Sequence, residues 1–166
     1  REVAWRARAL GADVIGLRRR PLPVEGVEVL SGDGALEGLL ARSHYVVLTA
    51  PETPATHGLM DRGALGRMRE DAVLVNVARG GLVDEDALAE ALEAGRLRGA
   101  ALDVFSAEPL PAGHRLWSAP RLVITPHVSA YSPWFWEREA ALLVENLGRW
   151  AAGEPLRNVV DKEAGY

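Results

Sequence analysis

The chain has 166 residues, of which 48% are hydrophobic and 25% charged, and its formal net charge at pH 7 is −4. This length and composition are typical of one globular domain with a full hydrophobic core. The absence of cysteine excludes disulfides, thiolate catalysis and cysteine-ligated zinc, and we expect no metal site. The acidic balance argues against nucleic acid as a partner, and no apolar run approaches the roughly 20 residues of a membrane helix. We therefore expect a cytoplasmic protein without membrane contact.

The first elements alternate between helix and strand. Residues 1–10 carry apolar side chains at helical spacing, and Gly11 suits the position that follows a helix. No N-cap residue precedes this helix, so we expect the chain to begin inside a βα unit. Residues 12–17 indicate a short strand. Three consecutive arginines follow it: Arg18, Arg19 and Arg20.

The middle of the chain repeats this alternation. Residues 36–41 are apolar enough for a helix and 44–49 for a buried strand, whereas the prolines of 51–54 indicate a loop. A short helix over 61–68 has Asp61 as its N-cap.

The organising stretch is residues 72–84, a valine-rich run that ends at Arg79 and two glycines. The run predicts a strand inside a sheet that is covered on both faces. Asp84 then caps a helix over 85–94. A strand that turns into a helix delivers its last residue to the edge where open α/β sheets bind ligands. Arg79 is therefore a candidate for binding an anion, and the alternative is a strand-end arginine paired with a local acid.

Two more strands, over 99–104 and 121–125, precede a long aromatic helix over 133–152 and an extended tail. Five strands alternating with helices predict βαβ units and a parallel sheet. The fold class is α/β, a Rossmann-type doubly wound parallel sheet that is truncated at its N-terminal end. We expect an incomplete nucleotide-binding domain over 1–132 and a C-terminal helix and tail over 133–166 that would return to an absent substrate domain.

Several side chains with useful chemistry fall at the carboxyl ends of these strands. The guanidinium of Arg79 can grip a carboxylate in bidentate fashion, and the imidazole of His127 can exchange a proton near neutral pH. Glu108 could orient that imidazole. His127 is the only histidine expected on this rim; the other three, which are read as surface residues, are His44, His57 and His114.

Each of these residues has a simpler interpretation when it is considered alone. Glu108 could be an ordinary loop acid, His127 a hydrogen-bonded rim histidine and Asp103 a structural cap. The aromatic side chains of the last helix are typical of packing or an interface rather than of a cofactor site. Only the placement of Arg79, Glu108 and His127 at the same edge favours a catalytic site. These residues can hold a substrate and transfer one proton, and hydride transfer to a bound cofactor is a reaction that needs no more than this.

Three motifs resemble the D-isomer-specific 2-hydroxyacid dehydrogenases: residues 75–84, the segment from Ala101 to Pro109, and residues 125–130. The tail over 153–158 also looks like the ending of that family. The resemblance, which is closest to glyoxylate/hydroxypyruvate reductases, implies an oxidoreductase that moves a hydride between NAD(P) and a small 2-hydroxyacid or 2-oxoacid. It implies that Arg79 binds the substrate carboxylate, that His127 is the acid–base and that Glu108 supports it. A homodimer is implied as well.

The same resemblance implies that the cofactor is bound by Ala50, Pro51, Val77, Ala78, Arg79, Asp103 and His127. Among these residues, Asp103 would hold the nicotinamide carboxamide. Arg18, with Arg19 beside it, stands where NAD-preferring members carry an acid. Since arginines there could bind a 2′-phosphate, we expect NADP to be accepted. The alternative is a solvated basic turn.

The front of the chain departs from the family, because neither the Gly-rich phosphate loop nor a substrate domain precedes Arg1. We therefore do not expect the chain alone to bind cofactor tightly or to turn over substrate, and the sequence does not select one 2-hydroxyacid. Two other functions remain open at this point: a dinucleotide-sensing or co-repressor-like module of the same fold, and a structural domain of a larger assembly.

Overall fold

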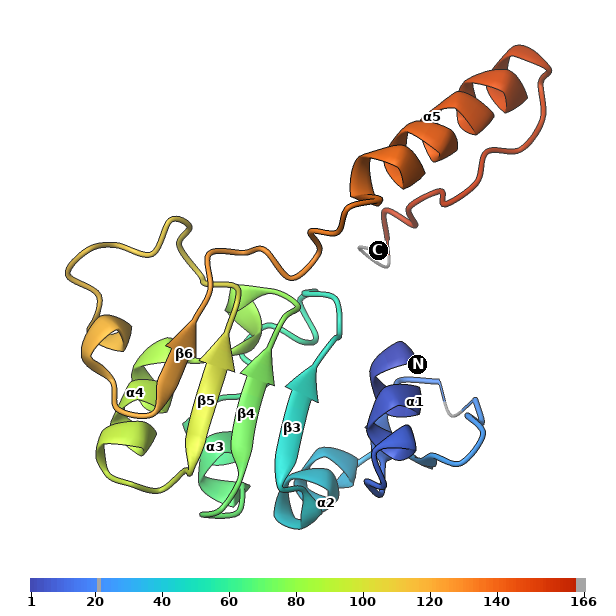
Figure 1. Ribbon diagram of the computed structural model, residues 1–166. Helices are drawn as coiled ribbons and strands as arrows, with labels where there is room; N and C mark the ends of the chain where they lie inside the picture. Colours follow the sequence, from blue (N-terminus) through green and yellow to red (C-terminus); the bar gives the residue numbers. More distant parts are fainter. Residues whose placement is uncertain (21, 164–166) are drawn as a thin grey trace.

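The protein, as a computed structural model, is described over residues 1–20 and 22–163 (Figure 1). Its centre is a four-stranded parallel sheet in the order β3-β4-β5-β6, formed by Tyr45–Leu48, Val73–Asn76, Gly99–Leu102 and Leu122–Ile124. In the register of this sheet, Val75 lies between Val47 and Ala101. All four carboxyl ends consequently meet at one edge, as the alternation of strands and helices predicted.

A second, two-stranded parallel sheet joins β1 (Ile15–Leu17) to β2 (Glu28–Leu30). The expectation of five strands was wrong, because β2 makes a sixth among the described residues. It has only three residues, Glu28–Leu30, and follows a segment rich in proline and glycine, so its two apolar side chains are too short a run to indicate a strand. Pairing with β1 defines this strand, and such long-range pairing is not visible in a local sequence pattern.

Helices α2 (Ala35–Arg42), α3 (Arg62–Arg67) and α4 (Glu85–Glu93) follow the strands, and α3 and α4 lie behind the four-stranded sheet in Figure 1. Both expected caps are confirmed: Asp61 accepts a hydrogen bond from the Ala64 amide at 2.7 Å, and Asp84 accepts one from the Ala87 amide at 2.9 Å. Leucines and alanines make up most of the core between helices and sheet, and the fully buried leucines include Leu40, Leu74, Leu82, Leu88, Leu92, Leu97 and Leu102.

The opposite face of the four-stranded sheet is partly open. Tyr45 and Val123 are 63% and 61% exposed on the outer strands, and Val73 and Val75 on β4 are half-buried. The expectation that β4 is covered on both faces was therefore wrong. The alternation along β4, in which Leu74 and Asn76 are buried, is the pattern of a sheet with one solvated face.

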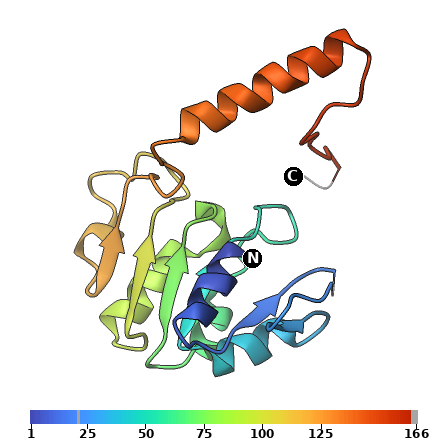
Figure 2. The ribbon, with the colours of Figure 1, turned by 45° about the vertical axis from the view of Figure 1, so that its right-hand side comes forward.

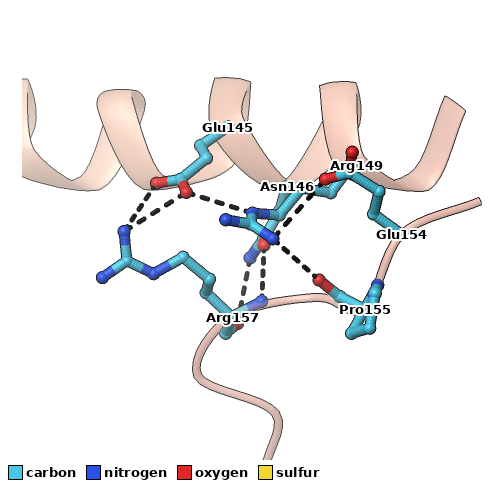
Figure 3. Close-up of polar contacts among 6 residues, drawn as sticks. All are labelled: Glu145, Asn146, Arg149, Glu154, Pro155 and Arg157. Atoms are coloured by element: carbon cyan, nitrogen blue, oxygen red, sulfur yellow. Dashed lines mark hydrogen bonds and ion pairs between the residues drawn. The ribbon is translucent and has the colours of Figure 1, made fainter. Parts of the chain in front are cut away.

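Helix α1 (Glu2–Ala9) starts the chain, and helix α5 (Phe135–Ala151) projects from the sheet near its end (Figure 2). No side chain of α5 is buried. The tail runs back along this helix, where Glu145 and Asn146 bind Arg157, and Arg149 binds the carbonyl of Pro155 (Figure 3). Within residues 1–20 and 22–163, no helix is long and apolar enough to cross a membrane.

Candidate functional site

Arg79 stands three residues beyond the end of β4, and the turn that carries it is fixed by Asn76. This asparagine is fully buried; its Oδ1 accepts a hydrogen bond from the Ala78 amide at 3.0 Å, and its Nδ2 donates to the Arg79 carbonyl at 2.8 Å. Satisfying both ends of a buried amide holds the turn in one geometry. The sequence analysis missed Asn76, although a polar residue inside an apolar strand was a signal for it.

The Arg79 side chain donates from Nη1 to the Ala78 carbonyl at 2.7 Å. No carboxylate of residues 1–20 or 22–163 lies within ion-pair distance of its guanidinium, so the alternative of a local acid partner is not supported. Glu108 lines the same cleft and interacts with this guanidinium electrostatically, but without an ion pair at contact distance. The guanidinium therefore keeps donors that are suited to an anionic ligand.

The two glycines after Arg79 allow very close approaches. A Cβ atom on Gly80 would lie 1.9 Å from the carbonyl carbon of Phe105, and one on Gly81 would lie 2.0 Å from Oε1 of Glu52. The first contact is with backbone, which cannot move aside as a flexible side chain can. Gly80 thus lets the turn after β4 pack directly on the segment after β5 that leads to Glu108.

Asp103 follows β5 and is only 4% exposed. Its carboxylate accepts hydrogen bonds from the Thr125 hydroxyl, from the Val128 amide at 3.0 Å and from the Ser129 amide at 2.8 Å. Burial alone would raise the pKa of Asp103, but these hydrogen bonds outweigh it and hold the pKa well below its usual range. Asp103 therefore fixes the loop on either side of His127.

His127 itself adopts a left-handed backbone conformation, with φ of 54°. Such a conformation costs a non-glycine residue about 1–3 kcal/mol and persists only where surrounding contacts hold it, which here are the hydrogen bonds to Asp103. The position of His127 after β6 is therefore determined by Asp103, the buried residue that follows β5.

The structure brings Glu108 and His127 together, although 19 residues separate them. The Glu108 carboxylate contacts Nδ1 of His127 at 2.7 Å through Oε2 and accepts a hydrogen bond from the Phe105 amide at 2.9 Å through Oε1. The hydrogen bond with His127, followed by that from Phe105, lowers the pKa of Glu108. Since Nδ1 is engaged, Nε2 is the ring nitrogen of His127 left to exchange a proton with a ligand.

Arg79, Glu108 and His127 line one cleft of about 370 Å³. Glu52 and His57 line the same cleft, and their side chains are joined at 2.9 Å between Oε1 and Nδ1. His57 is 70% exposed, as expected for a surface residue, but the expectation that His127 is the only histidine on the rim was wrong. A wider hollow of about 690 Å³ continues from Arg79, Glu52 and His57 to Val160 of the tail.

The rim has features that fit a dinucleotide. Ala50 and Pro51 follow β3, and Val77 and Ala78 follow β4, so small or apolar side chains occupy the carboxyl ends of adjacent strands. Such an edge can receive a flat aromatic ring. Arg18 and Arg19 follow β1 in the separate two-stranded sheet, where Arg18 donates to the Leu22 carbonyl at 3.1 Å.

Comparisons with known proteins agree with this geometry. The family model described as D-isomer specific 2-hydroxyacid dehydrogenase, NAD binding domain, matches residues 1–129. Glyoxylate/hydroxypyruvate reductase A of Escherichia fergusonii is 41% identical over 142 residues, which are 85% of this chain and 45% of that protein. D-3-phosphoglycerate dehydrogenase of Mycobacterium leprae is 37% identical over 167 residues, which cover 98% of this chain and 31% of that protein.

Two solved structures have nearly the same fold. A D-isomer specific 2-hydroxyacid dehydrogenase of Xanthobacter autotrophicus Py2 in complex with NADPH and MES gives a TM-score of 0.90 at 43% identity, covering 98% of this chain and 66% of that one. An NADPH-dependent glyoxylate/hydroxypyruvate reductase of Sinorhizobium meliloti in complex with NADP and sulfate gives a TM-score of 0.91 at 35% identity. The match covers 99% of this chain and 53% of that one. The chain thus spans between about a third and half of the curated relatives it matches.

Proposed function

The chain belongs to the D-isomer specific 2-hydroxyacid dehydrogenase family, in its NAD-binding domain, and on this premise we propose that it serves an NAD(P)-dependent oxidoreductase acting on small 2-hydroxyacids and 2-oxoacids. One observation carries the proposal. Arg79, whose guanidinium has no carboxylate of the described residues within ion-pair distance, and a carboxylate-held histidine line the same cleft at the carboxyl edge of a parallel sheet.

Each residue of the cleft has a distinct task in this reaction. Arg79 clamps the substrate carboxylate with its planar fork and draws electron density from the neighbouring carbonyl. In reduction, His127 gives the proton on Nε2 to the carbonyl oxygen as the alcohol forms; in oxidation, the same nitrogen takes the hydroxyl proton. Glu108 holds the ring through Nδ1 and so leaves Nε2 for the substrate. A bound nicotinamide supplies or accepts the hydride.

The cofactor would lie along the edge formed by Ala50, Pro51, Val77 and Ala78. Asp103 follows β5 at the same edge and would complete it, with its charged carboxylate oriented towards the carboxamide. Arg18 and Arg19 carry positive charge just after β1, where they would bind a 2′-phosphate, so we propose that NADPH is accepted. The NADPH and NADP in the Xanthobacter and Sinorhizobium structures support this choice.

The NADPH proposal is tested by the Arg18→Asp variant of the full-length gene product. Removing the arginine should lower kcat/KM with NADPH and leave kcat/KM with NADH nearly unchanged, because only NADPH carries the extra phosphate. The same ratio of the two efficiencies in parent and variant would leave the basic turn without a role in cofactor choice.

The reaction itself is tested by following NADPH oxidation by the full-length gene product with a panel of short 2-oxoacids. Turnover with at least one of them is expected, and Arg79→Lys should raise KM and lower kcat together, because a point charge replaces the bidentate fork. Tight NADPH binding without turnover of any panel member would instead favour a dinucleotide sensor of the same fold.

Two assembly features complete the proposal. The division into a nucleotide-binding part over 1–132 and a helix and tail over 133–166 accords with the projection of α5 away from the sheet (Figure 1). We propose a cytoplasmic homodimer, since α5 and the open face of the sheet carry exposed apolar side chains that an interface would cover.

A further inference from the structure

A second carboxylate–imidazole pair lines the same cleft as Glu108 and His127. Oε1 of Glu52 contacts Nδ1 of His57 at 2.9 Å, and both side chains line the cleft and the wider hollow beyond it, together with Arg79. The proposed hydride transfer uses only the first pair. Glu52 and His57 therefore have a position beside the substrate clamp but no part in the chemistry.

The loop that carries this second pair is held firmly. The Thr56 hydroxyl accepts a hydrogen bond from the Thr53 amide at 2.8 Å and donates one to the Pro51 carbonyl at 2.8 Å, and the His57 amide donates to the Thr53 carbonyl at 2.9 Å. These bonds fold residues 51–57 into a compact turn. The backbone position of His57 is thus set before any ligand binds.

The same loop is joined to the turn after Arg79. The Gly58 amide donates to the Gly81 carbonyl at 2.8 Å, and the Met60 amide donates to the Leu82 carbonyl at 2.8 Å. The Glu52 carboxylate rests directly over Gly81, where a Cβ atom would come within 2.0 Å of Oε1. Arg79 and the Glu52–His57 pair consequently belong to one rigid framework, as side chains that select a ligand require.

The charge on this pair limits what it can bind. With His57 neutral the pair carries one negative charge, and with His57 protonated it carries none, so it is never positive. Within residues 1–20 and 22–163, Arg79 is the only permanent cation that lines the two hollows, and its charge is matched by the reacting carboxylate. A second anionic group on the substrate would therefore be repelled by Glu52, and the described residues of this part of the cleft offer it no second cation.

A hydroxyl group would be received differently. Because Nδ1 of His57 is engaged with Glu52, a neutral ring leaves Nε2 as an acceptor, and the carboxylate offers further acceptor sites. Both can take a hydrogen bond from a substrate hydroxyl, and neither needs a positive partner to do so.

We propose that Glu52 and His57 form a specificity subsite for the third carbon of the substrate, one that accepts a hydroxyl there and rejects a phosphate or a second carboxylate. This inference rests on the proposed function and names the substrate class of that same site. It separates this chain from relatives such as the M. leprae D-3-phosphoglycerate dehydrogenase, whose name implies a phosphorylated substrate.

The test compares three 2-oxoacids that differ only at the third carbon: hydroxypyruvate, its phosphate ester and pyruvate. Steady-state NADPH oxidation by the full-length gene product is measured for the parent, for Glu52→Gln and for Glu37→Gln, a matched change at an exposed glutamate on α2. Glutamine keeps an oxygen for the His57 hydrogen bond and removes the charge. NADPH binding and thermal unfolding show that each variant is folded.

The parent should prefer hydroxypyruvate to both other compounds. Glu52→Gln should raise kcat/KM for the phosphate ester relative to hydroxypyruvate by about tenfold, the change that corresponds to ~1.4 kcal/mol of removed repulsion. Glu37→Gln should leave all three values unchanged.

Two results would contradict the inference in separable ways. An active parent that prefers the phosphate ester, or whose preference does not change in Glu52→Gln, overturns the subsite and leaves the proposed function intact. A folded parent that binds NADPH but reduces none of a wider panel of 2-oxoacids overturns the proposed function, and the subsite with it.

Discussion

Replacing Asp103 with asparagine tests how the His127 loop is held. The buried carboxylate accepts hydrogen bonds from the Thr125 hydroxyl, from the Val128 and Ser129 amides and from the Ser129 side chain. Asparagine keeps the shape but turns one oxygen into an NH2 group, which would face an N–H or O–H donor. A hydrogen bond to a charged group contributes about 1.5–3 kcal/mol, and a buried donor left without a partner costs about 1–3 kcal/mol. We therefore expect Asp103→Asn to lower the free energy of unfolding by about 2–4 kcal/mol at neutral pH.

The pH dependence of this loss has a definite sign. Because the pKa of Asp103 is lowered in the folded protein, its stabilisation is fully present above the ordinary pKa of 3.8 and is lost as the pH falls below that value. Urea unfolding followed by circular dichroism should thus show the gap between parent and Asp103→Asn narrowing between about pH 4 and pH 2. Asp33→Asn, at an exposed position, serves as the control. Equal free energies of unfolding in parent and Asp103→Asn at neutral pH would refute the reasoning. A difference between them that stays constant on acidification would refute it as well.

Three further changes test other parts of the account. Gly80→Ala should destabilise the protein by about 1–3 kcal/mol in urea unfolding, since its Cβ would meet the Phe105 backbone; unchanged stability would mean that the two segments separate freely. Asp84→Ala removes the cap bond to the Ala87 amide and should cost about 1 kcal/mol in the same assay, whereas an equal loss in Asp84→Asn would contradict a capping role. Glu108 has a lowered pKa and stays charged above its ordinary value of 4.5, so Glu108→Gln should lower turnover at pH 6 and pH 8 alike. A loss of turnover at only one of these two pH values would point to a different role for Glu108.

The sequence was most informative where structure depends on neighbouring residues. Asp61 and Asp84 could be recognised as caps because an N-cap bonds an amide only three residues away. The parallel sheet followed from the alternation of strands and helices, and it placed Arg79, Asp103 and His127 at one edge. The pairing of Glu108 with His127 was predicted from this placement and from the family resemblance, and the structure brings the two side chains into contact.

What depends on packing between distant segments could not be predicted. Strand β2 is defined by its partner β1, and the second histidine reaches the cleft only because the loop of residues 51–57 is bonded to the turn after Arg79. Asp103 was expected at the rim, but its bonds to Val128 and Ser129 depend on the path of a loop that no local pattern encodes. The open face of the sheet was missed because a valine-rich strand has the same appearance whether one or both faces are covered.

The central claim is that His127 exchanges the proton while Arg79 holds the substrate. It is tested most directly by the single-turnover rate of NADPH oxidation in the His127→Gln variant of the full-length gene product, with a 2-oxoacid that the parent reduces. The account predicts a rate lower by about 10²–10⁴-fold, because a positioned acid–base contributes that much, with the dissociation constant for NADPH nearly unchanged. A near-normal rate in a folded variant that binds NADPH would contradict it.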